Sequence, residues 1–125
     1  KLKELSNYLT ELESDLSIFF NISIDLLIIA DLNGVMLKLN PAWEEVLGYT
    51  RAEMVGRNYL DFLHPDDVPK TVDVREQLKY TDLKRFRNRW RHKEGHYVTL
   101  SWNAPAYTDK GRTYAIARVI NPECQ

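Results

Sequence analysis

The chain has 125 residues, and its 17 Lys and Arg against 18 Asp and Glu give a formal net charge of -1 at pH 7. Apolar residues make up 44% and charged residues 28% of the chain, which excludes an intrinsically disordered segment and a collagen-like repeat. The single cysteine, Cys124, excludes a disulfide framework and a cysteine-based zinc site, and the length predicts one domain.

Apolar side chains recur at intervals of three and four residues near the start of the chain, which places them along one seam of an amphipathic helix. They are Leu2, Leu5, Leu9, Leu12, Leu16 and Phe19. A narrow seam of this kind is typical of a two-stranded coiled coil. We therefore expect residues 1–20 to form a coiled-coil-like linker helix through which two copies of the chain make a homodimer. The alternative is a helix that packs on the core of its own domain.

Residues 26–39 predict a β-hairpin, because two apolar runs flank Asn33 and Gly34 and the glycine supplies the positive φ of a tight turn. Asn40 follows at once as the expected N-cap of a short helix. Pro41 suits the first position of that helix, and the glycine that follows Leu47 suits its left-handed end.

Three further short helical segments are predicted in the middle of the chain. Thr50 and Glu53 have the spacing of a capping box, which begins the first of them. The second covers residues 58–63. The third opens at Pro65 and is expected to end near Tyr80.

His64, Asp66 and Asp67 raise the alternative of a metal site at the start of the third helix. Three ligands within four residues are geometrically crowded, and no second histidine lies at helical spacing. Acidic residues also stabilise the positive end of a helix. A helix start is therefore the favoured interpretation.

The last third of the sequence predicts three strands. Basic residues alternate with Phe86, Asn88 and Trp90, and this period of two is typical of a strand. A turn at 94–95 leads to a strand over 96–106, and a turn at 108–111 leads to the last strand. With the first hairpin, these strands predict an α+β domain on a five-stranded antiparallel sheet.

Two questions stay open for the strand that contains Asn88: which of its faces points inward, and whether the tryptophans beside it line a ligand site. If Asn88 faces inward, it could orient a ligand beside Trp90 and Trp102; if Arg89 does, an anionic ligand is favoured. The two tryptophans could equally be plain core residues. The basic side chains suggest the alternative that this strand binds nucleic acid. Strict alternation, however, places them on the face opposite the aromatic rings, so no nucleic-acid partner is predicted.

Several short motifs follow one another in a characteristic order. They are DLLIIADLNG at 25–34, NPAW at 40–43, LGY at 47–49, HPDD at 64–67, FRNRWRHKEG at 86–95 and YAIAR at 114–118. With this order and spacing the sequence resembles a PAS domain from about residue 17 to residue 120. We accordingly expect a linker helix over 1–20, a PAS domain over 21–121 and the start of a C-terminal linker over 122–125.

The resemblance implies a sheet with strand order 2-1-5-4-3 and short helices on one flank that enclose a ligand pocket. It also implies a sensory module in a signalling protein, commonly a bacterial histidine kinase of a two-component system or a diguanylate cyclase, with no reaction in this chain itself. The candidate pocket residues are Ile29, Met36, Tyr59, Phe62, Asn88, Trp90 and Trp102.

The resemblance also restricts the cofactor. Flavin photosensors of the LOV type need a cysteine within the segment that here covers 56–60, and its absence excludes cysteinyl-flavin photochemistry. Haem is not expected, because residues 68–80 contain no His, Met or Cys that could be its axial ligand. Non-covalent flavin and a small metabolite both stay open, since an aromatic pocket suits either.

Three alternative functions follow: a ligand sensor, a ligand-free dimerisation and relay module, and an enzyme. The enzyme is rejected, because the histidines at 64, 92 and 96 are explained by turns and strand faces. The chain begins with Lys1, so we expect it to be a segment of a longer cytoplasmic protein whose output domain is its partner. No membrane contact is expected, since the longest apolar run, residues 26–30, is too short to span a bilayer.

Overall fold

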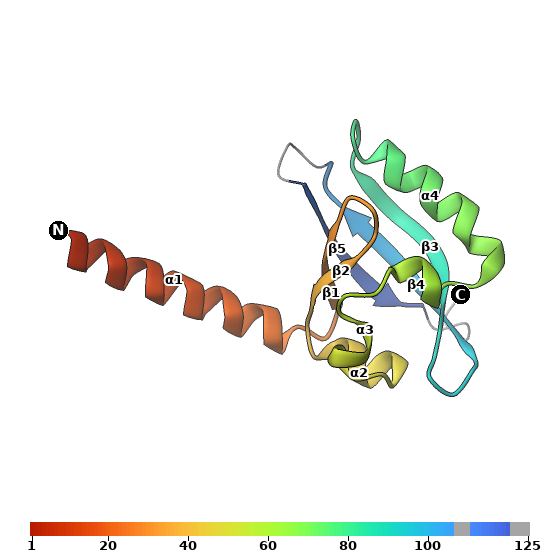
Figure 1. Ribbon diagram of the computed structural model, residues 1–125, viewed down its shortest axis with the longest axis horizontal. Coiled ribbons are helices and arrows are strands. Elements are labelled where there is room, and N and C mark those ends of the chain that lie inside the picture. The colour runs from red at the N-terminus through yellow and green to blue at the C-terminus, as the bar shows by residue number, and fades with distance from the viewer. Residues whose placement is uncertain (107–110, 121–125) are drawn as a thin grey trace.

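A five-stranded antiparallel sheet carries short helices on one face, and a long N-terminal helix extends away from it (Figure 1). The computed structural model describes residues 1–106 and 111–120. The strand order β2-β1-β5-β4-β3 confirms the order expected from the resemblance. The strands are β1 (Leu26–Asp31), β2 (Met36–Leu39), β3 (Leu83–Arg91), β4 (Tyr97–Ala104) and β5 (Arg112–Val119).

The helices fall at the predicted places, with small differences in length. They are α1 (Leu2–Ile22), α2 (Ala42–Leu47), α3 (Arg51–Met54), the 3-10 helices η1 (Tyr59–Phe62) and η2 (Pro65–Asp67), and α4 (Val68–Gln77). The helix predicted to open at Pro65 is thus a 3-10 turn followed by α4, and α4 ends at Gln77 rather than near Tyr80. The turn expected at 108–111 and the linker expected at 122–125 fall largely or wholly outside the described residues.

Two predicted helix ends are confirmed. The Thr50 hydroxyl accepts a hydrogen bond from the Glu53 amide at 3.2 Å, and the Glu53 carboxylate accepts one from the Thr50 amide at 2.8 Å. Gly48 ends α2 in the left-handed conformation, with φ 83°. Both ends therefore satisfy backbone groups that a short helix would otherwise leave without partners.

The predicted cap at Asn40 is wrong. The side chain of Asn40 is fully buried and makes no hydrogen bond to α2. Its Oδ1 accepts from the Leu27 amide at 2.9 Å, and its Nδ2 donates to the Asp25 carbonyl at 2.9 Å. The amide therefore ties the end of β2 to the start of β1, because a buried side-chain amide must find partners and these backbone groups need them.

The helices cover the inner face of the sheet, and the core lies between the two layers. Trp43 of α2 meets Trp90 of β3 and Trp102 of β4, with ring centroids 5.0 Å and 5.9 Å from that of Trp43. Asn88 and Trp90 point inward from β3, which settles the face of this strand. The strand is irregular near its start, where Arg85 has a φ of 54°.

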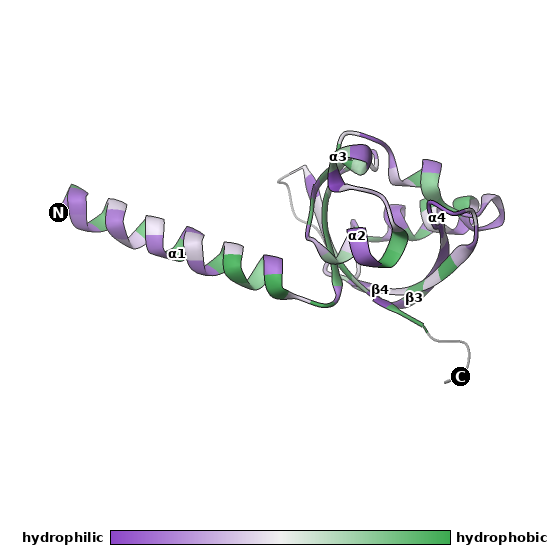
Figure 2. Cartoon of the chain, turned by 90° about the horizontal axis from the view of Figure 1, so that it is seen from below, coloured by the Kyte–Doolittle hydropathy of each residue, from purple (hydrophilic) through white to green (hydrophobic). Residues whose placement is uncertain are grey.

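Within the part of the chain that the structure describes, α1 has no fully buried side chain, and only Phe20, near its end, is partly covered. Its apolar seam is exposed along its whole length, from 41% at Leu12 to 85% at Leu2. Figure 2 shows hydrophobic and hydrophilic residues alternating along this projecting helix. The alternative of a helix packed on the core of its own domain therefore does not hold.

Candidate ligand-binding cavity

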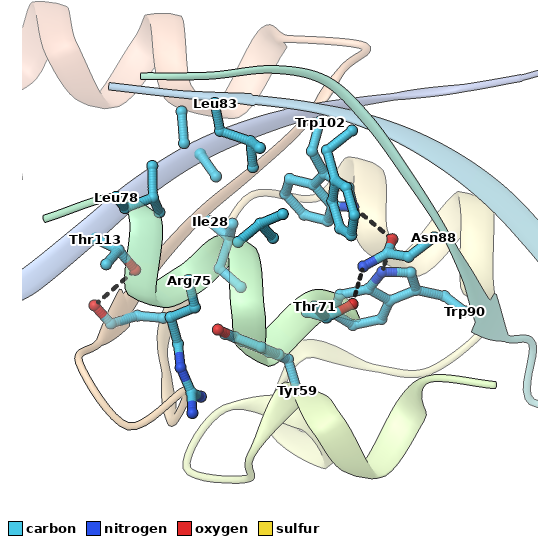
Figure 3. Close-up of a pocket in the computed structure, with 15 residues that line it drawn as sticks. Ile28, Tyr59, Thr71, Arg75, Leu78, Leu83, Asn88, Trp90, Trp102 and Thr113 are labelled. Carbon is cyan, nitrogen blue, oxygen red and sulfur yellow. Dashed lines mark hydrogen bonds between the residues drawn. The ribbon is translucent and has the colours of Figure 1, made fainter. Parts of the chain in front are cut away.

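A cavity of about 70 Å³ lies between α4 and the inner face of the sheet (Figure 3). α4 presents one face to it, formed by Thr71, Val74, Arg75 and Leu78. The spacing of three and four residues along α4 puts these side chains together on the side toward the sheet. All strands except β2 contribute to the opposite wall, and η1 adds Tyr59.

The wall of the cavity is mostly apolar. The sheet supplies Ile28, Ala30, Leu83, Phe86, Trp90, Trp102, Ala104 and Ala115. A cavity of this volume has room for roughly five waters. Apolar walls with few polar groups are typical of small-molecule sites, where the polar groups fix the orientation of the ligand.

Asn88 organises the inner end of the cavity. Its Oδ1 accepts hydrogen bonds from the indole N–H of Trp90 at 3.0 Å and of Trp102 at 2.8 Å. Its Nδ2 donates to the Thr71 hydroxyl at 3.2 Å, and that hydroxyl donates to the Asp67 carbonyl at 2.7 Å. The amide therefore holds both indole rings in place and links them to α4.

The opposite end of the cavity is polar. Arg75 and Tyr59 lie there, and Figure 3 shows the Tyr59 hydroxyl directed toward the side where Arg75 stands. Burial raises the pKa of the Tyr59 hydroxyl above its ordinary value, while the charge of Arg75 acts in the opposite direction. Tyr59 is therefore a neutral hydroxyl at physiological pH, able to donate and to accept.

An ion pair fastens α4 to β3 beside the cavity. The Asp67 carboxylate, 2% exposed, accepts from Nε and Nη2 of Arg89 at 2.9 Å and 2.7 Å, and also from the Arg89 amide at 2.7 Å. The hydrogen bonds from Arg89 lower the pKa of the Asp67 carboxyl to about 2, although burial acts in the opposite direction. Because Arg89 is held in this pair and does not line the cavity, it is not the residue that could bind an anionic ligand.

The structure brings together some of the residues predicted to line a pocket and separates others. Tyr59, Asn88, Trp90 and Trp102 line the cavity. Met36 and Phe62 are buried in the adjoining core, packed with Trp90 and its neighbours rather than facing the cavity. Ile29 points to the other face of the sheet, into a shallow groove, because side chains alternate along β1.

Sequence reasoning missed the residues that α4 contributes. It identified the helix but not the face formed by Thr71, Arg75 and Leu78. The signal was present, since these positions recur at intervals of three and four residues and would share one face of a helix. An arginine in such a stripe is a sign of a polar group placed against an otherwise apolar surface.

The histidine and aspartates at the start of η2 take structural roles. His64 Nδ1 accepts a hydrogen bond from the Asp66 amide at 3.1 Å, while Asp67 binds Arg89. Within residues 1–106 and 111–120, no three His, Cys, Asp or Glu side chains come together as a metal site. None of the helices described is long and apolar enough to cross a membrane.

Comparisons with known proteins point in one direction. The model of the PAS fold family matches residues 36–120. The PAS domain of an HTR-like protein from Haloarcula marismortui superposes with a TM-score of 0.79 at 24% identity, over 94% of this chain and 99% of that one. A domain of a sensory box sensor histidine kinase/response regulator from Geobacter sulfurreducens has a TM-score of 0.75 at 22% identity, over 88% of this chain and 96% of that one.

A curated relative is much longer than this chain. White collar 1 protein of Neurospora crassa is 28% identical over 89 residues, which are 70% of this chain. The match spans only 8% of that protein's length. The similarity therefore covers one short segment of that protein.

Proposed function

The chain belongs to the PAS family, and from this premise we propose that it is a sensory module whose cavity binds a small molecule and whose α1 joins two copies of the chain. PAS domains are generally non-catalytic sensory modules that connect to output domains. The chain is accordingly a signal-transduction module rather than an enzyme. Binding of a ligand and pairing with a second copy are the parts that we propose.

The observation that carries the proposal is the cavity between α4 and the sheet. Its walls are apolar, its inner end is held by the Asn88 hydrogen bonds, and both tryptophans face it. Its volume of about 70 Å³ suits a small metabolite better than the three-ring system of a flavin. We therefore favour a small metabolite over non-covalent flavin.

The exposed seam of α1 supports dimerisation. Six large apolar side chains stand in water along one side of a 21-residue helix. An isolated helix with such a seam gains stability by burying it against a second copy. The same helix would then serve as the linker of 1–20, with the PAS domain at 21–121 and a C-terminal linker beginning at 122.

The output domain is proposed from a protein whose domain has a similar structure. A similar structure comes from a sensory box sensor histidine kinase/response regulator. We place this module in a longer cytoplasmic signalling protein that carries a histidine kinase or a diguanylate cyclase as its output domain. The module itself contacts neither nucleic acid nor membrane in this proposal.

The test is native mass spectrometry of freshly purified protein, together with its near-ultraviolet and visible absorption spectrum. A bound small mass, with no chromophore band, is the expected result. A flavin spectrum would replace the metabolite with flavin. If the protein is a bare dimer and no compound in a metabolite library raises its melting temperature, the chain is the ligand-free relay module, for which the exposed α1 seam is sufficient.

A further inference from the structure

The polar groups along the wall of the cavity are already bound within the protein. Asn88 accepts hydrogen bonds from two indole N–H groups and donates one to Thr71. The Thr113 hydroxyl donates to the Ala30 carbonyl at 3.4 Å. A polar group that is paired in this way gains little from a ligand, because one hydrogen bond would only replace another. The wall therefore offers few polar groups that need a ligand.

The polar end of the cavity is closed by contacts with the hairpin between β1 and β2. Nη1 of Arg75 donates to the Asn33 carbonyl at 3.0 Å, and a Cβ added at Gly34 would lie 3.0 Å from the same nitrogen. That Cβ would also lie 3.3 Å from Cε2 of Tyr59, whose hydroxyl interacts with Arg75. Both side chains thus face each other and the hairpin.

One nitrogen at this end has no partner, but it is not open to the cavity. Among the described residues, Nε of Arg75 is the only buried side-chain nitrogen or oxygen that lacks a hydrogen-bond partner. It has essentially no surface accessible to a water-sized atom, so no oxygen of a ligand can reach it. The guanidinium is therefore a structural group that ties α4 to the hairpin.

A charged ligand finds no opposite charge in the cavity. Arg75 is the one cation among the described residues that line it, and no carboxylate is found among them. An anion would meet a guanidinium whose free N–H is enclosed, and a cation would meet no carboxylate at all. Burying a charge without a partner costs far more free energy than burying an apolar group of the same size.

The size of the cavity limits the ligand further. Its volume of about 70 Å³ is about half that of an engineered apolar cavity of roughly 150 Å³, which stays dry and binds benzene or xenon. Because it has room for roughly five waters, it suits a molecule of about five non-hydrogen atoms. Such a molecule gains van der Waals contacts with walls that otherwise face empty space.

We propose that the ligand of this cavity is an uncharged, apolar molecule of about five non-hydrogen atoms. It lies between α4 and the indole rings of Trp90 and Trp102, and it is bound by apolar contacts alone (Figure 3). In this arrangement Asn88 fixes the two rings and does not bind the ligand. The inference rests on the proposed function, because it assumes that the cavity binds a small molecule.

The experiment compares three probes of similar size: diethyl ether, diethylammonium and butanoate. Diethylammonium has the shape of diethyl ether but carries a positive charge at neutral pH, and butanoate carries a carboxylate. Binding is followed through the NMR signals of the Trp90 and Trp102 indole N–H groups and through the melting temperature. We expect diethyl ether to bind about 10-fold or more tightly than either ion, because neither ion finds a partner for its charge.

Variants of one strand test where the probe binds. Ala104 of β4 lines the cavity, so Ala104→Leu should fill it and weaken diethyl ether about 10-fold or more. Ala104→Val adds less volume and should weaken it by a smaller factor, which keeps the test available if the leucine variant does not fold. The matched control is Thr99→Leu, which enlarges a side chain on the outer face of the same strand and should leave the affinity unchanged.

The outcomes separate the inference from the function beneath it. Equal or tighter binding of either ion would overturn the inference and leave a ligand-binding cavity in place. Binding of diethyl ether that persists in folded Ala104 variants would place the probe elsewhere and overturn it too. If none of the probes binds although native mass spectrometry finds a bound compound, the class of ligand is wrong and the function stands. If neither experiment finds a ligand, the proposed binding function is wrong and the inference with it.

Discussion

Asp67 is a buried carboxylate whose two oxygens are bound by the guanidinium of Arg89. This pair joins the start of α4 to the edge strand β3, and α4 forms one wall of the cavity. Breaking a buried ion pair leaves its remaining charge without a partner. Because Arg89 is partly exposed, we expect Asp67→Asn to lower the free energy of unfolding by about 2 to 3 kcal/mol, below the full cost of a buried pair. Urea denaturation at neutral pH measures this loss.

The same pair predicts how stability depends on pH. The pKa of Asp67 is lowered from 3.8 to about 2 in the folded protein. The stabilisation is therefore complete above the unfolded pKa and is lost as the pH falls through the folded pKa, between about 4 and 2. Asp67→Asn should flatten this part of the stability profile. Asp66→Asn, next to it but exposed, is the control; an equal flattening there would assign the effect to general surface charge.

The glycines that end short helices make different contacts, although they share one backbone conformation. Gly48 ends α2 with φ 83°, and Gly56 follows α3 with φ 91°. A Cβ added at Gly48 would lie 2.9 Å from Cε1 of His92, whereas one added at Gly56 would meet no atom within 4 Å among the described residues. The two positions therefore separate backbone strain from steric conflict.

We expect Gly56→Ala to cost about 1 kcal/mol, which is the strain of a left-handed alanine. Gly48→Ala should cost about 1 kcal/mol more, because the loop that carries His92 must also move. Thermal unfolding of the two variants, each against the unmodified protein, gives the comparison. Equal losses would mean that the β3–β4 turn moves aside freely and that packing at Gly48 adds nothing.

The seam of α1 predicts the oligomeric state. Leu9 and Leu12 lie at its centre and are both exposed in the single chain. Replacing both with Glu puts two like charges into each helix of a pair, so we expect monomers by light scattering. The control adds the same charge on the opposite side of the helix, in Asn7→Glu with Ser14→Glu, and should leave the dimer intact. An unchanged mass in the seam variant would show that the dimer forms elsewhere.

Local patterns predicted most of the elements, because each rests on neighbouring residues. The capping box at Thr50 and Glu53 and the left-handed end at Gly48 involve hydrogen bonds within a few residues, and both formed as expected. The prediction that Asn40 caps α2 failed because its hydrogen bonds are not local. Its partners, Asp25 and Leu27, are distant in the sequence, and the pairing of β1 with β2 brings them to it.

The candidate site was predicted less completely than the fold. Alternation along the strands identified Asn88, Trp90 and Trp102, but their mutual hydrogen bonds require β3 and β4 to be in register. Arg75 was missed, because its importance depends on the hairpin carbonyl that holds it, 42 residues away in the sequence. Ile29 was predicted to line the pocket but lies on the outer face of the sheet. The side chains of β1 are apolar on both faces, so the sequence pattern does not show which of them point inward.

At the scale of the whole molecule, the sheet separates the two features that the proposed signalling must connect. On its inner face lies the cavity, and on its outer face lies a groove lined by Phe20 of α1 and by residues of β1 and β5. Ile28 and Ala115 border both. A ligand that shifts β1 or β5 therefore acts directly on the surface next to the end of α1, with no chain of intermediates required.

This arrangement predicts that ligand binding and dimerisation are coupled. If occupancy of the cavity changes the balance between two packings of α1, each bound ligand changes the dissociation constant of the dimer by the same factor by which dimerisation changes the ligand affinity of one site, typically about 5- to 150-fold. Since the dimer has two cavities, saturating ligand changes its dissociation constant by the square of that factor. Analytical ultracentrifugation with and without a saturating concentration of the compound found by native mass spectrometry gives the change in the dimer dissociation constant. Titration of the dimer and of the monomeric Leu9→Glu, Leu12→Glu variant gives the affinity ratio of one site. A change in the dimer dissociation constant that is not the square of the affinity ratio would mean that the seam variant perturbs the cavity. No change in either quantity would show that the sheet does not transmit occupancy to α1.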